Sequence, residues 1–279
     1  MAPPAVRPAN VRALKVVPLI ERLSIAGALP PQGPYSPAVR AGDFLLLSGQ
    51  IPVDPHTGVW DDGDLAREAS RIFENLDLLL ATAKVTRQQV VTCRVFLSHA
   101  SDSAAIHALC TGFFAGHPPA GSTLEVGFRN PRMRLEIEAT IFAPLTEKDP
   151  QMIERITPPG CPVPHGPYSP AVRAGDFIFV SGQAAVDPVT QAWSFGDVRH
   201  ETRRTLENIK LILAGCGAEM ADVVKCTVFL KDGRDFAAMN EIYAEFFGQS
   251  KPARSTVEVR FANAGMKIEI EAVAYRPPV

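Results

Sequence analysis

The sequence predicts an α+β fold present in two tandem copies, and three observations lead to that prediction. A ten-residue segment, 33–42, recurs letter for letter as 166–175, an offset of 166 − 33 = 133 residues. Each copy has strand-like segments toward both ends and two amphipathic segments of helical period, which is typical of helices packed on one face of a sheet. The composition is that of an ordinary globular protein, with 46% hydrophobic and 21% charged residues.

The repeat also sets the domain organisation. The same offset relates 136–139 to 269–272, and no gap is needed anywhere. This period is far longer than the roughly 20 to 50 residues of a solenoid repeat, so it indicates a duplicated domain. We predict an N-terminal extension at 1–18, domains at 19–143 and 152–276, and a polar, Pro-bounded linker at 144–151. The extension holds four prolines and no continuous apolar segment, which favours disorder over a transit peptide.

The first half of the second copy contains a strand and a helix. An Ala-Gly-Asp turn at 174–176 precedes a short apolar strand at 177–181. Asp197 is a helix-capping residue type, and the apolar residues after it recur at helical spacing until Gly215 and Gly217. We therefore expect a helix that begins after Asp197 and ends near Gly215.

The second half contains a strand, a helix and two more strands. Residues 223–231 alternate as a strand does, and 236–247 have the period of a second helix. Two further strands are expected at 254–260 and 267–275. The connection between them contains an asparagine and a glycine, so we expect these last two strands to pair as a hairpin.

This expected hairpin places charged side chains together. Arg254, Thr256 and Glu258 share one face of their strand, and Glu269 and Glu271 share one face of the last strand. Pairing would bring a guanidinium and carboxylates to one surface. The alternative is a cross-strand salt bridge on a solvated face, which contributes little stability.

Charge and cysteine usage exclude several classes of function. Lys and Arg total 28 against 30 Asp and Glu, so the net charge of −2 gives no support to nucleic acid or an anionic membrane as a partner. No apolar run reaches the roughly 18 residues of a membrane helix. The five cysteines are an odd number without CxxC spacing, which argues against disulfides and a zinc site. We expect a cytoplasmic protein without a metal.

Five segments of the second copy carry a resemblance to a known family. They are 166–169 (GPYS), 181–183 (SGQ), 228–232 (VFLKD), 252–255 (PARS) and 268–272 (IEIEA). In these motifs and their order the chain resembles the Rid/YjgF family of reactive intermediate deaminases, formerly described as L-PSP endoribonucleases. The resemblance implies a chorismate-mutase-like α+β fold and trimers with clefts between subunits. It also implies hydrolysis of enamines and imines, such as 2-aminoacrylate, to 2-keto acids and ammonia without cofactor or metal.

The resemblance also implies roles for individual residues. Arg254 would bind the substrate carboxylate, because a guanidinium matches that group bidentately. Glu269 would position or deprotonate water and pass a proton to the leaving nitrogen, and Tyr168 would close the cleft. The implied substrate-binding residues are Ser181, Gly182, Asn240 and Thr256. Simpler interpretations remain open: Tyr168 as a loop anchor, Gly182 as a backbone requirement and Asn240 as a helix-surface residue.

The first copy departs from these motifs. Gly121 stands at the Arg254 position and His107 at the Asn240 position, while Tyr35 and Glu136 are kept. A glycine cannot bind a carboxylate by charge, so we expect one competent domain and one structural or complementing domain. Because sites in this family lie between subunits, the resemblance allows Tyr35 to face Arg254 across a domain boundary.

Assembly follows from symmetry. Three chains supply six lobes, enough for two rings of three, so we predict a homotrimer. The competing arrangement pairs the two lobes of one chain as a pseudo-dimer.

The predicted function is therefore a cofactor-independent deaminase of small carboxylate-bearing enamines or imines, acting mainly through the second domain. A specialised intermediate of the aminomuconate or 3-aminoacrylate type is the alternative substrate. A non-catalytic ligand-binding protein and a ribonuclease are the alternative classes, and the absence of a basic-aromatic stripe weighs against the ribonuclease.

Overall fold

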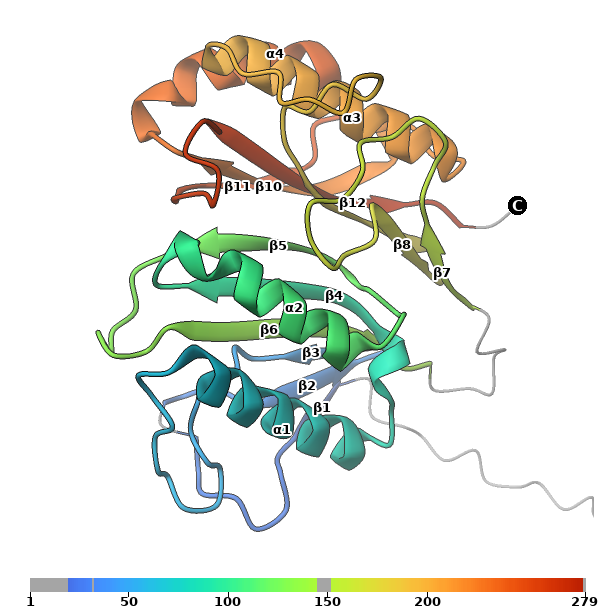
Figure 1. The fold of residues 1–279 in the computed structure, drawn as a ribbon. Coiled ribbons are helices and arrows are strands. Elements are labelled where there is room, and N and C mark those ends of the chain that lie inside the picture. The colour runs from blue at the N-terminus through green and yellow to red at the C-terminus, as the bar shows by residue number, and fades with distance from the viewer. Residues whose placement is uncertain (1–19, 32, 145–151, 278–279) are drawn as a thin grey trace, which may run out of the picture.

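The computed structural model describes residues 20–31, 33–144 and 152–277. The predicted extension at 1–18 lies outside these described residues, and so does all of the predicted linker except Pro144. Two similar domains lie one above the other (Figure 1). This arrangement confirms the predicted fold class of two tandem α+β domains.

The first domain contains six strands and two α-helices among the described residues. They are β1 (Ile20–Leu23), β2 (Ala38–Ala41), β3 (Phe44–Leu47), α1 (Leu65–Ala83), β4 (Val90–Leu97), α2 (Ser103–Phe114), β5 (Ala120–Glu125) and β6 (Leu135–Phe142).

The second domain repeats these elements in the same order. They are β7 (Ile153–Ile156), β8 (Ala171–Ala174), β9 (Phe177–Gln183), α3 (Val198–Gly215), β10 (Val223–Leu230), α4 (Phe236–Phe247), β11 (Ala253–Glu258) and β12 (Ile268–Tyr275). Short 3-10 turns precede β4, α2, β10 and α4 at Arg87–Gln89, Ala100–Asp102, Met220–Asp222 and Gly233–Asp235.

Both sheets have the same mixed topology. The strand order is β1-β2-β3-β6-β4-β5 in the first domain and β7-β8-β9-β12-β10-β11 in the second. The β4–β5 and β10–β11 pairs are parallel, and the other pairs are antiparallel. In each domain the two helices cover one face of the sheet (Figure 1).

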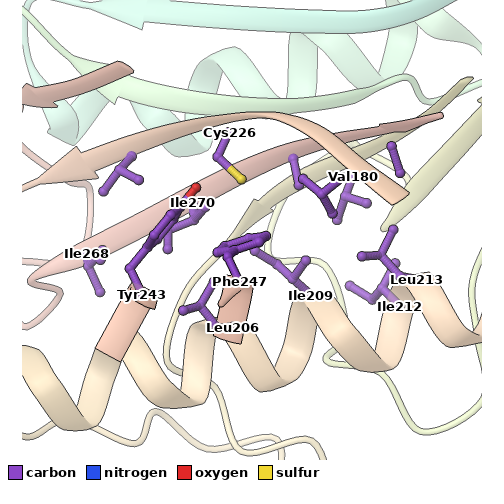
Figure 2. Close-up of a cluster of buried hydrophobic side chains, with 14 of the residues drawn as sticks. Val180, Leu206, Ile209, Ile212, Leu213, Cys226, Tyr243, Phe247, Ile268 and Ile270 are labelled. Carbon is purple, nitrogen blue, oxygen red and sulfur yellow. The ribbon is translucent and has the colours of Figure 1, made fainter. Parts of the chain in front are cut away.

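Local sequence signals account for the two helices of the second domain. The Asp197 carboxylate accepts a hydrogen bond from the His200 backbone N–H, so it caps α3 as predicted. The apolar residues of α3 face the sheet and pack on strand residues such as Ile268 and Ile270 (Figure 2). The predicted range of α4 agrees with the observed one. Burying these side chains supplies the main stabilisation of the domain.

The predicted hairpin between the last two strands is wrong. β11 pairs in parallel with β10, and β12 pairs with β10 and β9, so β10 lies between the two strands that were expected to be neighbours. The turn residues at 261–266 therefore belong to a crossover around β10. Strand pairing is a long-range choice, and local turn signals do not decide it.

The two domains share an interface built from β5 and β9. The Gly121 N–H donates to the Ser181 hydroxyl at 2.9 Å, and the Ser169 N–H donates to the Pro119 carbonyl at 2.9 Å. Apolar residues from both domains complete it, including Leu124 of β5 packed with Phe229 of β10. The interface therefore buries residues at β5 of the first domain against residues of the second domain around β9 and β10.

Candidate active site

A cavity of about 300 Å³ lies between the two domains. The first domain contributes residues of α2 and β5, and the second domain contributes the loop before β8, the end of β9 and the start of β12. Its polar lining includes His107, Ser122, Thr123, Tyr168, Gln183 and Glu269. We call this cavity the interdomain cleft. Its volume is at the lower end of the range for small-ligand sites.

Glu269 is the buried carboxyl group of the interdomain cleft. The β12 strand holds it against the backbone of Gly182, where an added Cβ would lie only 1.9 Å from the Glu269 Oε1 atom. The pKa of Glu269 is raised to about 8, mainly by burial. The nearby Glu271 carboxylate also raises it, whereas the Ser122 hydroxyl and Arg94 lower it. A pKa near 8 suits a group that gives and accepts protons at neutral pH.

Two predicted residues, Tyr168 and Ser181, lie at the boundary between the domains. Burial raises the pKa of Tyr168 to about 12, so its hydroxyl stays protonated, and it accepts a hydrogen bond from the His165 N–H at 3.3 Å. The Ser181 hydroxyl donates to the Ser169 carbonyl at 2.6 Å while accepting from Gly121. Ser181 therefore connects the two domains by hydrogen bonds. Gly182 beside it lines the cleft.

The structure does not bring Arg254, Thr256 and Asn240 to this cleft. The Arg254 guanidinium lies over the rings of Tyr243 and Phe236 of α4, at 4.6 and 5.6 Å from their centroids. Arg254 therefore lies on the helix side of the second domain. The seven predicted site residues are divided between two places on the chain.

Strand register explains this separation. Arg254 pairs with Cys226, whose side chain belongs to the helix-side core. Glu269 pairs with Phe229, whose ring belongs to the apolar cluster between the domains. Neighbouring side chains on paired strands share a face, so Arg254 and Glu269 lie on opposite faces of one sheet. The prediction that the two would share a surface is wrong within a single domain.

The first domain covers the interdomain cleft with the residues that replace Arg254 and Asn240. Gly121 is packed so tightly that an added Cβ would lie 1.8 Å from the Cys93 carbonyl oxygen. His107 lines the cleft, and its Nε2 lies 3.0 Å from the Thr123 hydroxyl. Burial lowers the pKa of His107, which favours the neutral imidazole. The cover of this cleft is therefore polar but lacks a guanidinium.

The first domain carries a second copy of the carboxyl arrangement. Glu136 lies against Gly49, where an added Cβ would be 1.9 Å from the Glu136 Oε1 atom. Burial raises the pKa of Glu136, and the Glu138 carboxylate raises it further. The neighbouring hollow of about 410 Å³ is lined by Tyr35 and Gly49 together with other residues of the first domain. No described residue of the second domain covers it.

Sequence reasoning missed the contribution of the first domain to the cleft around Glu269. Ser122 is buried, lines the cleft and lies beside the Glu269 carboxyl. It also missed Arg94, which forms ion pairs with Glu138 of its own domain and Glu271 of the other. The repeat offset marks Ser122 as the counterpart of Ser255, but no local signal says which domain it faces.

Other types of site are not found in the described part of the chain. No group of three or more His, Cys, Asp or Glu side chains there could hold a metal ion. The five cysteines are free thiols in buried positions. None of the described helices is long and apolar enough to span a membrane.

Comparison with known proteins gives a consistent result for both domains. The family model described as endoribonuclease L-PSP matches residues 26–143 and again 160–276. A RutC family protein of Pyrococcus horikoshii is 52% identical over 125 residues, which are 45% of this chain and 99% of that protein. The 3-aminoacrylate deaminase RutC of Acinetobacter baylyi is 39% identical over 122 residues, 44% of this chain and 97% of that protein.

Two further similarities complete the comparison. The 2-iminobutanoate/2-iminopropanoate deaminase of Dermatophagoides farinae is 38% identical over 118 residues, 42% of this chain and 92% of that protein. The crystal structure of the YjgF gene product of E. coli matches at 41% identity with a TM-score of 0.42, covering 44% of this chain and 98% of that one. Each of these relatives corresponds in length to about one domain of this chain.

Proposed function

The chain belongs to the endoribonuclease L-PSP family, and from that premise we propose that it is a deaminase that hydrolyses small, carboxylate-bearing enamines and imines to 2-keto acids and ammonia. Relatives named as deaminases of 3-aminoacrylate and of 2-iminobutanoate or 2-iminopropanoate support this chemistry. The observation that carries the proposal is the carboxyl group held against a glycine backbone in each domain, Glu136 on Gly49 and Glu269 on Gly182.

A raised pKa fits both proton transfers of this reaction. The protonated carboxyl gives a proton to the imine nitrogen, or to carbon when the substrate arrives as the enamine. The carboxylate that results takes a proton from water as the water oxygen bonds to the imine carbon. That proton passes to nitrogen and the C–N bond breaks. Ammonia leaves as the carboxylate takes the proton of the hydroxyl group and the carbonyl forms, which restores the protonated carboxyl. No redox step or external acceptor is required.

Arg254 is the residue that we assign to the substrate carboxylate, with Thr256 on the same face of β11 and Asn240 on α4, the helix that Arg254 packs against. Glu269 cannot be its partner within one domain, because the two lie on opposite faces of the sheet. We assign the proton-transferring carboxyl group that acts with Arg254 to Glu136 of a second copy of the chain. This site, the interchain site, is the counterpart of the interdomain cleft with Arg254 in place of Gly121.

Exposed apolar residues support this pairing with a second copy. Val257 is 45% exposed, whereas Leu124, its counterpart at the offset of 133 residues, is 1% exposed in the interdomain interface. Val224 is 44% exposed, whereas its counterpart Val91 is fully buried. The second domain thus leaves open the surface that the first domain buries.

The first domain leaves the complementary surface open. Tyr35 is 49% exposed and Leu46 is 48% exposed, whereas their counterparts Tyr168 and Phe179 are partly buried at the interdomain interface. The two open surfaces are therefore the two halves of one interface, which head-to-tail contact between chains would bury.

We propose that this contact closes a ring of three chains. In a ring, every lobe contacts two neighbours, one through each half of the interface described above. The two lobes of one chain already contact each other, so a ring of three would need a third lobe with both halves free. No lobe has both free, because each uses one half to contact the other domain of its own chain. Two separate three-lobe rings are therefore incompatible with this packing, and a homotrimer takes the form of one six-lobe ring.

Disrupting the open surface tests this assembly. We expect Val257→Glu to reduce the mass measured by light scattering to that of the 30.1 kDa chain, because it buries a charge in the apolar contact. Val189→Glu is the control, because Val189 is 89% exposed and its counterpart His56 is exposed too. A Val257→Glu protein that keeps the wild-type mass would contradict the assignment of this surface.

Complementation between inactive chains tests the proposed function. Ammonia release is measured from 2-aminoacrylate, generated enzymatically, and in parallel from 3-aminoacrylate. We expect Arg254→Ala and Glu136→Gln each to lower the rate at least about 100-fold, since each removes a charged or proton-transferring group at the reacting centre. Co-expressed with separate tags and co-purified through both tags, the two variants should recover about a third of wild-type activity, because a mixed ring of three chains has one junction in three with both residues intact.

The matched control is Glu269→Gln, which leaves every interchain site intact and should keep most of the activity on the carboxylate substrate. If Glu269→Gln were as inactive as Arg254→Ala, the result would contradict the interchain site and favour an active site within the second domain. Absence of recovery in the co-purified assembly would likewise exclude the interchain site. Failure of wild type to release ammonia from either substrate would exclude the deaminase proposal.

A further inference from the structure

The interdomain cleft has no cationic anchor for a carboxylate. None of the described residues that line it is lysine or arginine. Its two imidazoles do not replace one, because burial favours neutral His107, and His165 is exposed and stacks on the ring of Trp193 with centroids 4.9 Å apart. A carboxylate that entered this cleft would lose water without gaining an opposite charge, which costs free energy.

The guanidinium whose charge acts on Glu269 is already engaged. Arg94 bonds to Glu271 through its Nε atom at 3.2 Å and forms a second ion pair with Glu138. It does not line the interdomain cleft. Its charge is balanced by two carboxylates, so it is not free to bind a third.

The packing of Gly121 explains why the interdomain cleft has no cationic side chain at this position. The glycine N–H donates to the buried Ser181 hydroxyl, and an added Cβ would collide with the Cys93 carbonyl. The collision is with backbone, which cannot move aside as a side-chain end can. The interface is therefore constructed around a residue without a side chain.

The remaining lining offers neutral hydrogen-bonding groups among apolar walls. Ser122 is 4% exposed, and its hydroxyl is one of the groups that lower the pKa of Glu269. It lies beside the Glu269 carboxyl group, which is protonated at neutral pH. The apolar residues that line the cleft include Pro162, Val163, Trp193 and Phe261.

From this geometry we infer that the interdomain cleft binds a small uncharged carbonyl or imine compound, with the Glu269 carboxyl donating to its oxygen or nitrogen and Ser122 beside it. The chain then carries two kinds of site built from one repeat. The interchain site takes carboxylates through Arg254, and the interdomain cleft takes neutral molecules. This inference goes beyond the proposed function, which concerns the interchain site.

Two ligands of equal size but different charge test it. Pyruvamide and pyruvate have the same number of non-hydrogen atoms, and only pyruvate is charged. The chain has two tryptophans, so Trp60→Phe leaves Trp193 in the cleft wall as the single fluorophore. In this background at pH 7 we expect pyruvamide to quench Trp193 with a Kd at least about 10-fold below that of pyruvate, because the cleft has no charge to pair with a carboxylate.

Variants of Glu269 separate the hydrogen bond from the shape of the cleft. Glu269→Leu should weaken pyruvamide about 3- to 10-fold by removing the donor, while Glu136→Leu, the same change in the other domain, should leave the Trp193 signal unchanged. At pH 9 the wild-type carboxyl is ionised, so Glu269→Gln should bind pyruvamide more tightly than wild type. This comparison holds even if the leucine variant fails to fold. Arg94, Glu271 and Tyr168 also face Glu269 and are the same in both proteins.

Three results would overturn the inference: pyruvate bound at Trp193 as tightly as pyruvamide, no quenching by pyruvamide, or equal pyruvamide affinity of wild type and Glu269→Gln at pH 9. The complementation assay depends on Arg254 and Glu136, so its failure is distinguishable from failure here. An Arg254→Ala chain should still bind pyruvamide at Trp193 with wild-type affinity.

Discussion

Glu269→Gln is expected to make the folded protein more stable than wild type at pH 9, by on the order of 4 kcal/mol. The buried Glu269 carboxyl has a pKa of about 8 in the folded chain, against an ordinary value of 4.5. Between these two values the folded state holds one proton more than the unfolded state. The contribution of this group to the free energy of unfolding is therefore fully present below pH 4.5. It falls as the pH rises to about 8 and changes little above that.

The glutamine variant lacks this titration. The difference in free energy of unfolding between the variant and wild type should thus be small at pH 5, grow through pH 7 and level off by pH 9. Urea unfolding at the three pH values measures it. Other buried carboxyls with raised pKa values, Glu68 and Glu136, are present in both proteins and cancel in the difference.

The control is Glu245→Gln, which alters an exposed ion pair with Arg203 and should give a small difference at every pH. A difference for Glu269→Gln that does not vary with pH would show that the carboxyl is ionised in the folded chain. Glu269 would then not be the proton donor that the interdomain cleft requires.

Arg94→Ala is expected to lower the free energy of unfolding by about 2–3 kcal/mol, less than for a fully buried pair because the side chains are partly exposed. Arg94 is 28% exposed and bridges Glu138 of the first domain to Glu271 of the second, which is 14% exposed. Its removal leaves the carboxylates facing each other across the interface. The pKa of Glu269 should rise further, because Arg94 is one of the groups that lower it.

Urea unfolding at pH 7 measures the loss, with Arg199→Ala as the matched control. Arg199 also pairs with a glutamate, Glu241, but both side chains are about half exposed, so little change is expected there. Adding Glu271→Gln to the Arg94→Ala chain should recover part of the stability, because one of the repelling charges is gone. Equal effects of the two arginine variants would contradict a bridging role for Arg94.

The helices and the duplication could be predicted from the sequence because their signals are local or exact. Asp197 and the apolar spacing after it place α3, and the range of α4 follows from its period. The offset of 133 residues determines the two domains without any structural input. Such signals depend on neighbouring residues along the chain, so tertiary context does not need to be known.

The position of β11 could not be predicted in this way. Turn residues at 261–266 favour a hairpin with β12, yet β11 pairs with β10. Which strands become neighbours depends on how the whole sheet buries its apolar face, and no window of adjacent residues contains that information. That single pairing moves Arg254 away from Glu269.

By itself, the sequence determined the family resemblance, the two-domain α+β fold and the chemically capable residues, among them Arg254, Glu269 and Tyr168. Only the tertiary structure decided which of them meet. Side chains alternate across a sheet, so strand order and register put Arg254 on the helix side and Glu269 in the interdomain cleft. The contact of β5 with β9 then placed Gly121 of the first domain over the cleft that contains Glu269, while Arg254 lies over the rings of α4.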